Sequence, residues 1–134
     1  MDLVSIWAFD KSYTKMTCVH NFDANDKIRL TDVELSKDKY PRYFDKIISE
    51  IHVLADDVSS HASTKELIED YFKVYDIKSL LDYIIYTDNK PRAVICCETV
   101  ANHRQWTEDD LNYLRMATVL ASTRLDFATM NLTG

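Results

Sequence analysis

Residues 80–106 constrain the fold of this chain more than any other segment. Two apolar runs rich in β-branched and aromatic residues, 80–86 and 93–99, flank a polar turn at 87–91 that contains Asp, Asn and Pro. Runs of this composition on either side of such a turn predict a β-hairpin. We expect this hairpin to lie in the middle of a sheet.

Other segments predict the strands that accompany this hairpin. Residues 3–9 are apolar and β-rich, and residues 14–22 alternate apolar and polar side chains, so these two runs predict a first hairpin. Val33 and Leu35 indicate a short edge strand, and residues 52–56 a further brief strand. Together these runs predict a central antiparallel sheet of five to six strands.

Two helices are expected between the hairpins. Pro41 occupies a first helical position and is followed by apolar residues at three- and four-residue spacing, namely Phe44, Ile47, Ile48 and Ile51. Ser63 and Glu66 match a capping box, and the apolar stripe after them consists of Leu67, Ile68, Tyr71, Phe72 and Tyr75.

A long final helix is predicted to begin at Thr107 and to continue to about Met130. Thr107 and Asp110 resemble a capping box, and the acidic residues 108–110 place negative charge where the helix dipole favours it. Short strands joined mostly as hairpins, interrupted by two helices and closed by a long one, predict an α+β layer fold.

Composition excludes several classes of protein. The 134 residues suit one domain, and no apolar run is long enough to cross a membrane. The first residues lack the pattern of a signal peptide, so we expect a cytoplasmic protein with no direct membrane insertion. The net charge is -6 and the basic residues are scattered, which argues against nucleic acid as a partner.

Glycine and cysteine narrow the chemistry further. Gly134 is the only glycine, so the glycine-rich phosphate loops of kinases, GTPases and dinucleotide enzymes are excluded, and Asp, Asn and Pro must make the tight turns. Cys18, Cys96 and Cys97 form no C-x-x-C pair, and neighbours on a strand point to opposite faces of the sheet. Neither disulfides nor a metal site is expected.

Several short segments occur in a recognisable order along nearly the whole chain. They are 5–10, Tyr43-Phe44, 55–57, 64–67, Tyr71-Phe72, 77–82, Cys97-Glu98 and 104–108. In this order and spacing they resemble the GAF domains of bacterial signalling proteins. Three features differ from the family pattern. Ala93 and Asp76 stand where glycine is usual, Thr99 stands where histidine often follows Glu98, and the chain starts directly in the first strand.

The resemblance implies a GAF-like (profilin-like) sheet with helices packed on one face and a loop-covered pocket on the other. It also implies that residues 1–134 are a single sensory domain, a fragment of a larger signalling protein such as a histidine kinase or a diguanylate cyclase or phosphodiesterase. Such modules pass signals through their terminal helices and often dimerise there. We therefore expect a homodimer formed through the C-terminal helix and an attached or partner effector domain, as in two-component systems.

The residues expected to line the pocket are mostly aromatic, with apolar faces and polar tips that suit a small molecule. The candidates are Trp7, Phe9, Tyr43, Tyr71, Tyr75, Leu81, Tyr83, Cys97, Glu98 and Trp106. Asp82 lies on a central strand, where a buried carboxylate needs a partner, which Arg104, Ser79 or a ligand could supply. The pair Asp56-Asp57 is interpreted as the end of a strand that caps the next segment.

No cofactor is identified from the sequence. Some GAF relatives attach a bilin through a thioether and others use cysteines to reduce free methionine sulfoxide, but neither cysteine pattern is matched here. We therefore expect no bilin, and interpret the cysteines as small apolar fillers. A haem held by His61 or His103 is not expected either.

These observations favour a non-catalytic sensory or regulatory module that binds a small molecule or relays a conformational change to an effector. The sequence leaves two alternatives open. One is a structural or dimerisation domain whose pocket is closed by its own side chains. The other is an enzyme of the free methionine sulfoxide reductase type.

Overall fold

The computed structural model describes residues 2–133, with side chains described as far as Thr123. One six-stranded sheet runs through it in the order β3-β2-β1-β6-β5-β4, and every neighbouring pair is antiparallel. The strands are β1 (Leu3–Phe9), β2 (Lys15–Asp23), β3 (Glu34–Ser36), β4 (His52–Ala55), β5 (Ile77–Thr87) and β6 (Lys90–Val100). The α+β fold with a central antiparallel sheet is therefore confirmed.

The predicted hairpins are present. β5 and β6 pair from Ile77 with Val100 to Thr87 with Lys90, and they occupy the middle of the sheet. The turn residues Asp88 and Asn89 have φ values of 52° and 62°. Two successive left-handed residues match the twist of a two-residue hairpin, and Asp and Asn tolerate this conformation better than most residues.

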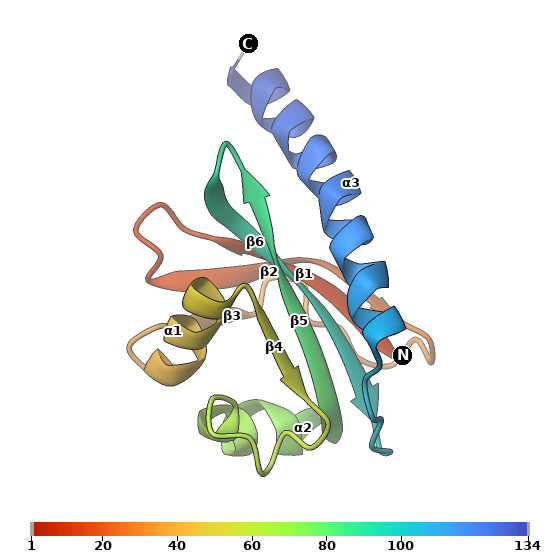
Figure 1. Cartoon of the computed structure of the whole chain (residues 1–134). Helices are drawn as coiled ribbons and strands as arrows, with labels where there is room; N and C mark the ends of the chain where they lie inside the picture. The colour runs from red at the N-terminus through yellow and green to blue at the C-terminus, as the bar shows by residue number, and fades with distance from the viewer. Residues whose placement is uncertain (1, 134) are drawn as a thin grey trace.

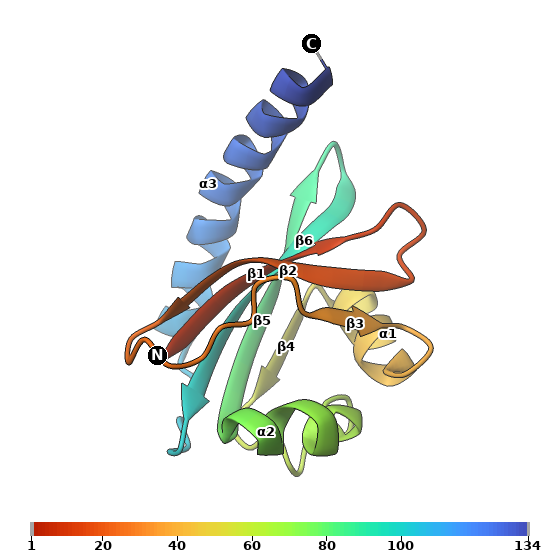
Figure 2. The same cartoon turned by 180° about the vertical axis from the view of Figure 1, so that it is seen from behind.

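The helices lie on both faces of the sheet, as Figures 1 and 2 show, and not on one face as the resemblance implied. α3 (Glu108–Thr133) crosses one face, while α1 (Pro41–Glu50) and α2 (Lys73–Tyr75) lie against the other. The core is correspondingly divided into two clusters. Phe44, Ile47 and Phe72 belong to the cluster under α1 and α2, and Ile85 and Leu114 belong to the cluster under α3.

The start of α3 matches its prediction. The Asp110 backbone N–H donates to Thr107 Oγ1, and the Thr107 N–H donates to Asp110 Oδ2, so both residues of the expected box cap the helix. The Arg104 guanidinium also donates to Asp110, at 2.8 Å. Among the described residues, no helix is both long and apolar enough to cross a membrane.

The second predicted helix differs from its expectation. Residues 65–75 form a 3-10 turn, η1 (Lys65–Leu67), a π-helical segment, η2 (Ile68–Phe72), and the single turn α2. The Ser63 side chain does not cap this segment. Glu66 Oε1 instead accepts the backbone N–H groups of Arg42 and Tyr43, and so caps the beginning of α1. Glu66 therefore makes a tertiary contact with α1 in place of the predicted capping box with Ser63.

Glu66→Ala should destabilise the fold by about 1 kcal/mol, because the first turn of α1 loses its only side-chain cap among the described contacts. Urea denaturation at neutral pH measures this change. Glu69→Ala is the matched control, since Glu69 forms only an exposed i,i+4 ion pair with Lys73 and should cost about 0.3 kcal/mol. Equal effects of the two substitutions would contradict the capping role.

The backbone also differs from the sequence-based expectation at two positions, Ile51 and Asp76. α1 ends at Glu50, so Ile51 is half-exposed with a φ of 74° and does not belong to the buried stripe predicted for this helix. Asp76, which stands where GAF domains usually have glycine, adopts the left-handed conformation with a φ of 58°. Asp thus supplies the backbone angle for which glycine is usual.

Candidate functional site

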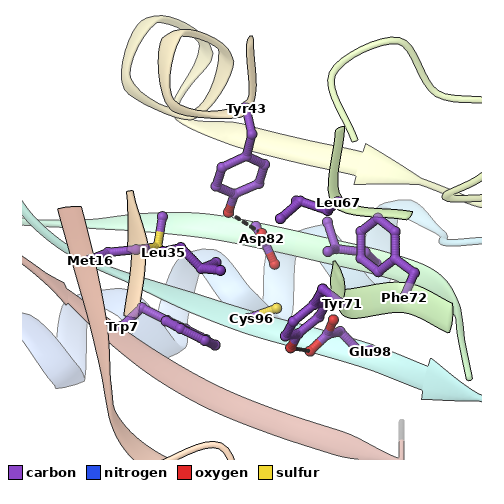
Figure 3. Close-up of a pocket in the computed structure, with 11 residues that line it drawn as sticks. Trp7, Met16, Leu35, Tyr43, Leu67, Tyr71, Phe72, Asp82, Cys96 and Glu98 are labelled. Carbon is purple, nitrogen blue, oxygen red and sulfur yellow. Dashed lines mark hydrogen bonds between the residues drawn. The ribbon is translucent and has the colours of Figure 1, made fainter. Parts of the chain in front are cut away.

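A small buried cavity lies between the sheet and the helical segments on the α1 face (Figure 3). Its volume is about 20 Å³, which is enough for roughly one water molecule. The lining is mainly aromatic and aliphatic, with two carboxyl groups, and consists of Trp7, Met16, Leu35, Tyr43, Leu67, Tyr71, Phe72, Leu80, Asp82, Cys96 and Glu98.

Strand alternation brings the polar lining together. Side chains two residues apart on a strand point to the same face, so Cys96 and Glu98 of β6 both point toward α1 and η2. Asp82 of β5 lies directly opposite Cys96, and Leu80 lies opposite Glu98. The two carboxyl groups are therefore diagonal neighbours on adjacent central strands.

Each carboxyl group accepts one hydrogen bond from a tyrosine of the roof. The Tyr43 hydroxyl of α1 donates to Asp82 Oδ2, and the Tyr71 hydroxyl of η2 donates to Glu98 Oε1 at 2.9 Å (Figure 3). Asp82 is 1% exposed and Glu98 is fully buried. Asp82 Oδ1 and Glu98 Oε2 have no hydrogen-bond partner among the described residues.

Burial strongly disfavours the charged forms of these groups. It raises the pKa of Asp82 to about 7, although the Cys96 thiol and the Tyr43 hydroxyl act in the opposite direction. Burial, together with the charge of Asp82, raises the pKa of Glu98 to about 8. The pKa values of Tyr43, Tyr71 and Cys96 are also raised well above their usual range, mainly by burial. At acid pH the cavity therefore holds neutral groups.

The structure divides the predicted site residues between two faces. Trp7, Tyr43, Tyr71 and Glu98 line the cavity, while Phe9 and Tyr75 pack against the same core cluster without lining it.

The remaining candidates, Leu81, Tyr83, Cys97 and Trp106, belong to the cluster under α3 on the opposite face of the sheet. The expectation that they share one pocket with Glu98 needs correction, because Leu81 and Cys97 are the strand neighbours of Asp82 and Glu98 and must point away from them.

Several lining residues were not among the predicted candidates: Met16, Leu35, Leu67, Phe72, Leu80 and Cys96. The residue parity of β6 could have identified Cys96, since it shares a face with Glu98. The helical segments offered no comparable signal, because Leu67 and Phe72 reach the cavity only through the tertiary fold.

Of the partners expected for Asp82, the two protein side chains are not used. Among the described residues, neither Arg104 nor Ser79 forms a hydrogen bond to Asp82, which is bonded to Tyr43 instead. Ser79 donates to the Asp56 carbonyl oxygen at 2.6 Å and accepts the Arg104 backbone N–H at 2.7 Å. Asp57 Oδ1 accepts the Ser59 backbone N–H and so caps the segment that follows, as predicted for this pair. The Asp56 carboxylate instead accepts the backbone N–H of Trp106, far along the chain.

The cysteines lie on separate faces and are buried. Cys96 lines the cavity, whereas Cys97 faces α3, and burial raises the pKa of Cys97 to about 12. Cys18 is buried in the cluster under α1, and burial raises its pKa to about 11. Thiols with pKa values this high are poor nucleophiles at neutral pH.

Metal and haem ligands are not assembled in the part of the chain that the structure describes. No group of three His, Cys, Asp or Glu side chains there could hold a metal ion. His61 and His103, the two candidate haem ligands, do not line the cavity. The His103 ring lies 3.6 Å from the Asp57 carboxylate, in a partly exposed position.

No protein-family model and no curated protein matches the chain, but many solved structures share its fold. The phycocyanobilin-bound GAF domain of a cyanobacterial phytochrome aligns at a TM-score of 0.79 and 13% identity, over 98% of this chain and 78% of the other. The biliverdin-bound far-red dark state of JSC1_58120g3 aligns at 0.78 and 12%, over 96% and 81%. A GAF domain/HD domain protein from Geobacter sulfurreducens aligns at 0.74 and 11%, over 96% and 82%.

These similarities correct one expectation and confirm another. The lack of a matching cysteine pattern predicted that the chain has no bilin. This prediction was wrong, because structures that match nearly the whole chain are bilin-bound. The similarity covers nearly the whole chain and includes both the bilin-bound domains and the GAF domain/HD domain protein. The chain has the fold of the GAF domains, as the order of its sequence segments implied.

Proposed function

We propose that this chain is a non-catalytic sensory or regulatory module of a signal-transduction protein, which binds a small molecule at the cavity and relays a conformational change through α3. The observation that carries this proposal is a buried cavity with two carboxyl oxygens that lack partners. A buried acceptor without a donor costs free energy, so a ligand that supplies the donor is bound favourably. We place the module in the cytoplasm, as the sequence predicts.

The same two strands connect the cavity with α3. Asp82 and Glu98 face the cavity, while their neighbours Leu81 and Cys97 pack in the cluster that includes Leu114 of α3. A ligand that shifts β5 or β6 must therefore change the packing beneath α3. Such a shift biases the conformations available to an attached effector, such as a kinase or a cyclic-dinucleotide enzyme.

A bilin is one ligand class for this site, because the bilin-bound structures share the fold. A cavity of about 20 Å³ does not hold a tetrapyrrole, since sites for ligands of that size occupy roughly 300 Å³ or more. α1 and η2 would have to move away from the sheet to admit it. Cys96 is the only cysteine that lines the cavity among the described residues.

The small cavity also favours a second candidate function. A structural or dimerisation domain would need no ligand. Its interior would be filled by its own side chains, and the small size of the cavity agrees with this. Ligand binding separates the two functions, because a molecule that binds only the native state raises the unfolding temperature.

The test is a thermal-unfolding screen of the purified chain with small amines, nucleotides, and biliverdin or phycocyanobilin, followed by native mass spectrometry. The sensory proposal expects at least one class to raise the unfolding temperature in a saturable way. It also expects Glu98→Gln to weaken that shift, while Glu69→Gln at the surface leaves it unchanged. If no class shifts the transition and no molecule co-purifies, the structural function is favoured.

We further propose that two copies associate through α3. Tyr113, Met116 and Leu120 recur at three- and four-residue spacing and are 65%, 72% and 71% exposed, on the side of α3 away from the sheet. An exposed apolar stripe on a helix suits pairing with a second copy about a two-fold axis. Such pairing would join the relay helices of two modules.

The variant with Met116→Glu and Leu120→Glu should weaken self-association by at least about tenfold, because charge would enter an apolar helix seam. Sedimentation equilibrium measures the dissociation constant. Val74→Glu is the control, since Val74 is similarly exposed but lies on α2 at the other face. A wild-type chain that stays monomeric at high concentration would refute this interface.

A further inference from the structure

We propose that the cavity binds a small organic cation of the primary ammonium class, held between Asp82 Oδ1 and Glu98 Oε2. This inference rests on the proposed sensory function and deepens it by naming the chemical class of the ligand. The recognition would use hydrogen bonds from the ammonium group to both carboxylates and contact of its alkyl group with the aromatic wall.

The unpartnered oxygens define what the ligand must bring. Asp82 and Glu98 each use one oxygen to accept a tyrosine hydroxyl and leave the other unpaired within the buried lining (Figure 3). Ionised carboxylates are acceptors only, so a neutral ligand must offer N–H or O–H groups and a charged one must be a cation. An ammonium group has three donors, enough to reach both oxygens.

The charge of the site favours a cation over a neutral donor. Burial, Cys96 and Tyr43 perturb the pKa of Asp82, and burial, Asp82, Tyr71 and Cys96 perturb the pKa of Glu98. None of these side chains carries a positive charge. Cys18, on β2, also senses the charge of Glu98, and it too is neutral or negative. A buried charge is normally paired, and here the described side chains provide no positive partner.

The walls of the cavity fit an alkylammonium better than an inorganic ion. Trp7, Tyr43, Tyr71 and Phe72 line the cavity beside the carboxyl groups, and aromatic rings attract organic cations while also accepting a methyl group. Sodium or potassium would find two unpaired carboxyl oxygens, with the other carboxyl oxygens already bonded to the tyrosine hydroxyls. With a volume of about 20 Å³, the cavity admits the ammonium group, and a methyl group enters with a small outward shift of the aromatic side chains.

Binding should be coupled to proton release. With pKa values of about 7 and 8, the two carboxyls hold protons in weakly acid solution, and a cation binds after these protons pass to the solvent. The affinity for an ammonium ion should therefore rise between about pH 6 and pH 8.5. A neutral donor gains less from ionised carboxylates than a cation does, so its affinity should rise less over the same pH range.

The experiment measures unfolding temperature and calorimetric binding of the whole chain with methylammonium chloride, against sodium chloride at equal ionic strength and tetramethylammonium chloride. Methylammonium should bind in the millimolar range, because so few atoms can contribute little affinity. Binding should be stronger at about pH 8.5 than at pH 6. Asp82→Asn and Glu98→Gln should each weaken it at least about tenfold, while Glu69→Gln should not.

The outcomes separate this inference from the proposed function. If methylammonium acts no better than sodium or tetramethylammonium, or if its effect survives in both variants, the cation site is refuted. If a bilin or another class then raises the unfolding temperature, the sensory function still stands with a different ligand. If nothing binds, both the cation site and the sensory function are refuted. Circular dichroism of each variant confirms that a lost effect reflects lost binding in a folded protein.

Discussion

Glu98→Gln should make the protein more stable than the wild type in alkaline solution, and this advantage should disappear as the pH falls. Burial and the neighbouring Asp82 raise the pKa of Glu98 from 4.5 to about 8. Between these values the folded chain keeps a proton that the unfolded chain has released. The contribution of Glu98 to stability is therefore full below about pH 4.5 and is lost as the pH rises through 8.

The expected size follows from this pKa difference. Each pKa unit corresponds to about 1.4 kcal/mol, so the loss for wild-type Glu98 is on the order of several kcal/mol. Glutamine does not titrate, and its amide oxygen can still accept the Tyr71 hydroxyl. Its NH₂ group would lack an acceptor, which offsets about 1 to 3 kcal/mol. A net gain of about 2 kcal/mol at pH 9 is therefore expected.

Urea denaturation of both proteins at about pH 5, 7 and 9 tests this prediction. Asp82→Asn should behave in the same direction with its transition near pH 7, and the two effects should not add because the two charges interact. Glu69→Gln, which removes a similar charge from the surface, should leave the pH profile unchanged. An alkaline loss of stability in Glu98→Gln would indicate that Glu98 is ionised and well solvated in the native state.

The sheet could be predicted from the sequence because its signals are local. Two β-rich runs around Asp88-Asn89 specify a hairpin, since the turn residues adopt the left-handed angles that the strand twist requires. The capping box at Thr107 is equally local and lies where it was expected. The segment after Ser63 could not be predicted in the same way, because Glu66 is used by a helix that begins more than twenty residues earlier in the chain.

The candidate site was predicted only in part, for a reason that is specific to central strands. β5 and β6 are covered on both faces, so nearly all of their central residues are buried and hydrophobic periodicity does not distinguish the faces. Cys97 and Glu98 were therefore assigned to one pocket although they lie on opposite sides. The size of the cavity depends on side-chain packing from eight separate helices and strands, which sequence periodicity does not specify.

Ser79→Ala should destabilise the fold by about 2 to 4 kcal/mol, because one buried hydroxyl satisfies two backbone groups. Ser79 Oγ donates to the Asp56 carbonyl oxygen and accepts the Arg104 N–H, and its removal leaves both groups without this partner. Urea denaturation measures the loss. Ser59→Ala is the control, since the exposed Ser59 hydroxyl bonds only to Asp57 and its removal should change stability by less than about 0.5 kcal/mol.

The same substitution tests whether the Ser79 contacts anchor the beginning of α3. Trp106 is held to β4 and the segment after it, because its backbone N–H donates to Asp56 Oδ1 at 2.9 Å and its indole N–H donates to the Ala55 carbonyl at 3.3 Å. Without Ser79, Asp56 and Arg104 are no longer joined, so amides near Thr107 should exchange hydrogen faster than those of β5 and β6. If exchange increases equally throughout the chain, Ser79 contributes only to global stability. A selective increase at the start of α3 would mean that this helix is attached to the sheet through the contacts of Ser79 on β5.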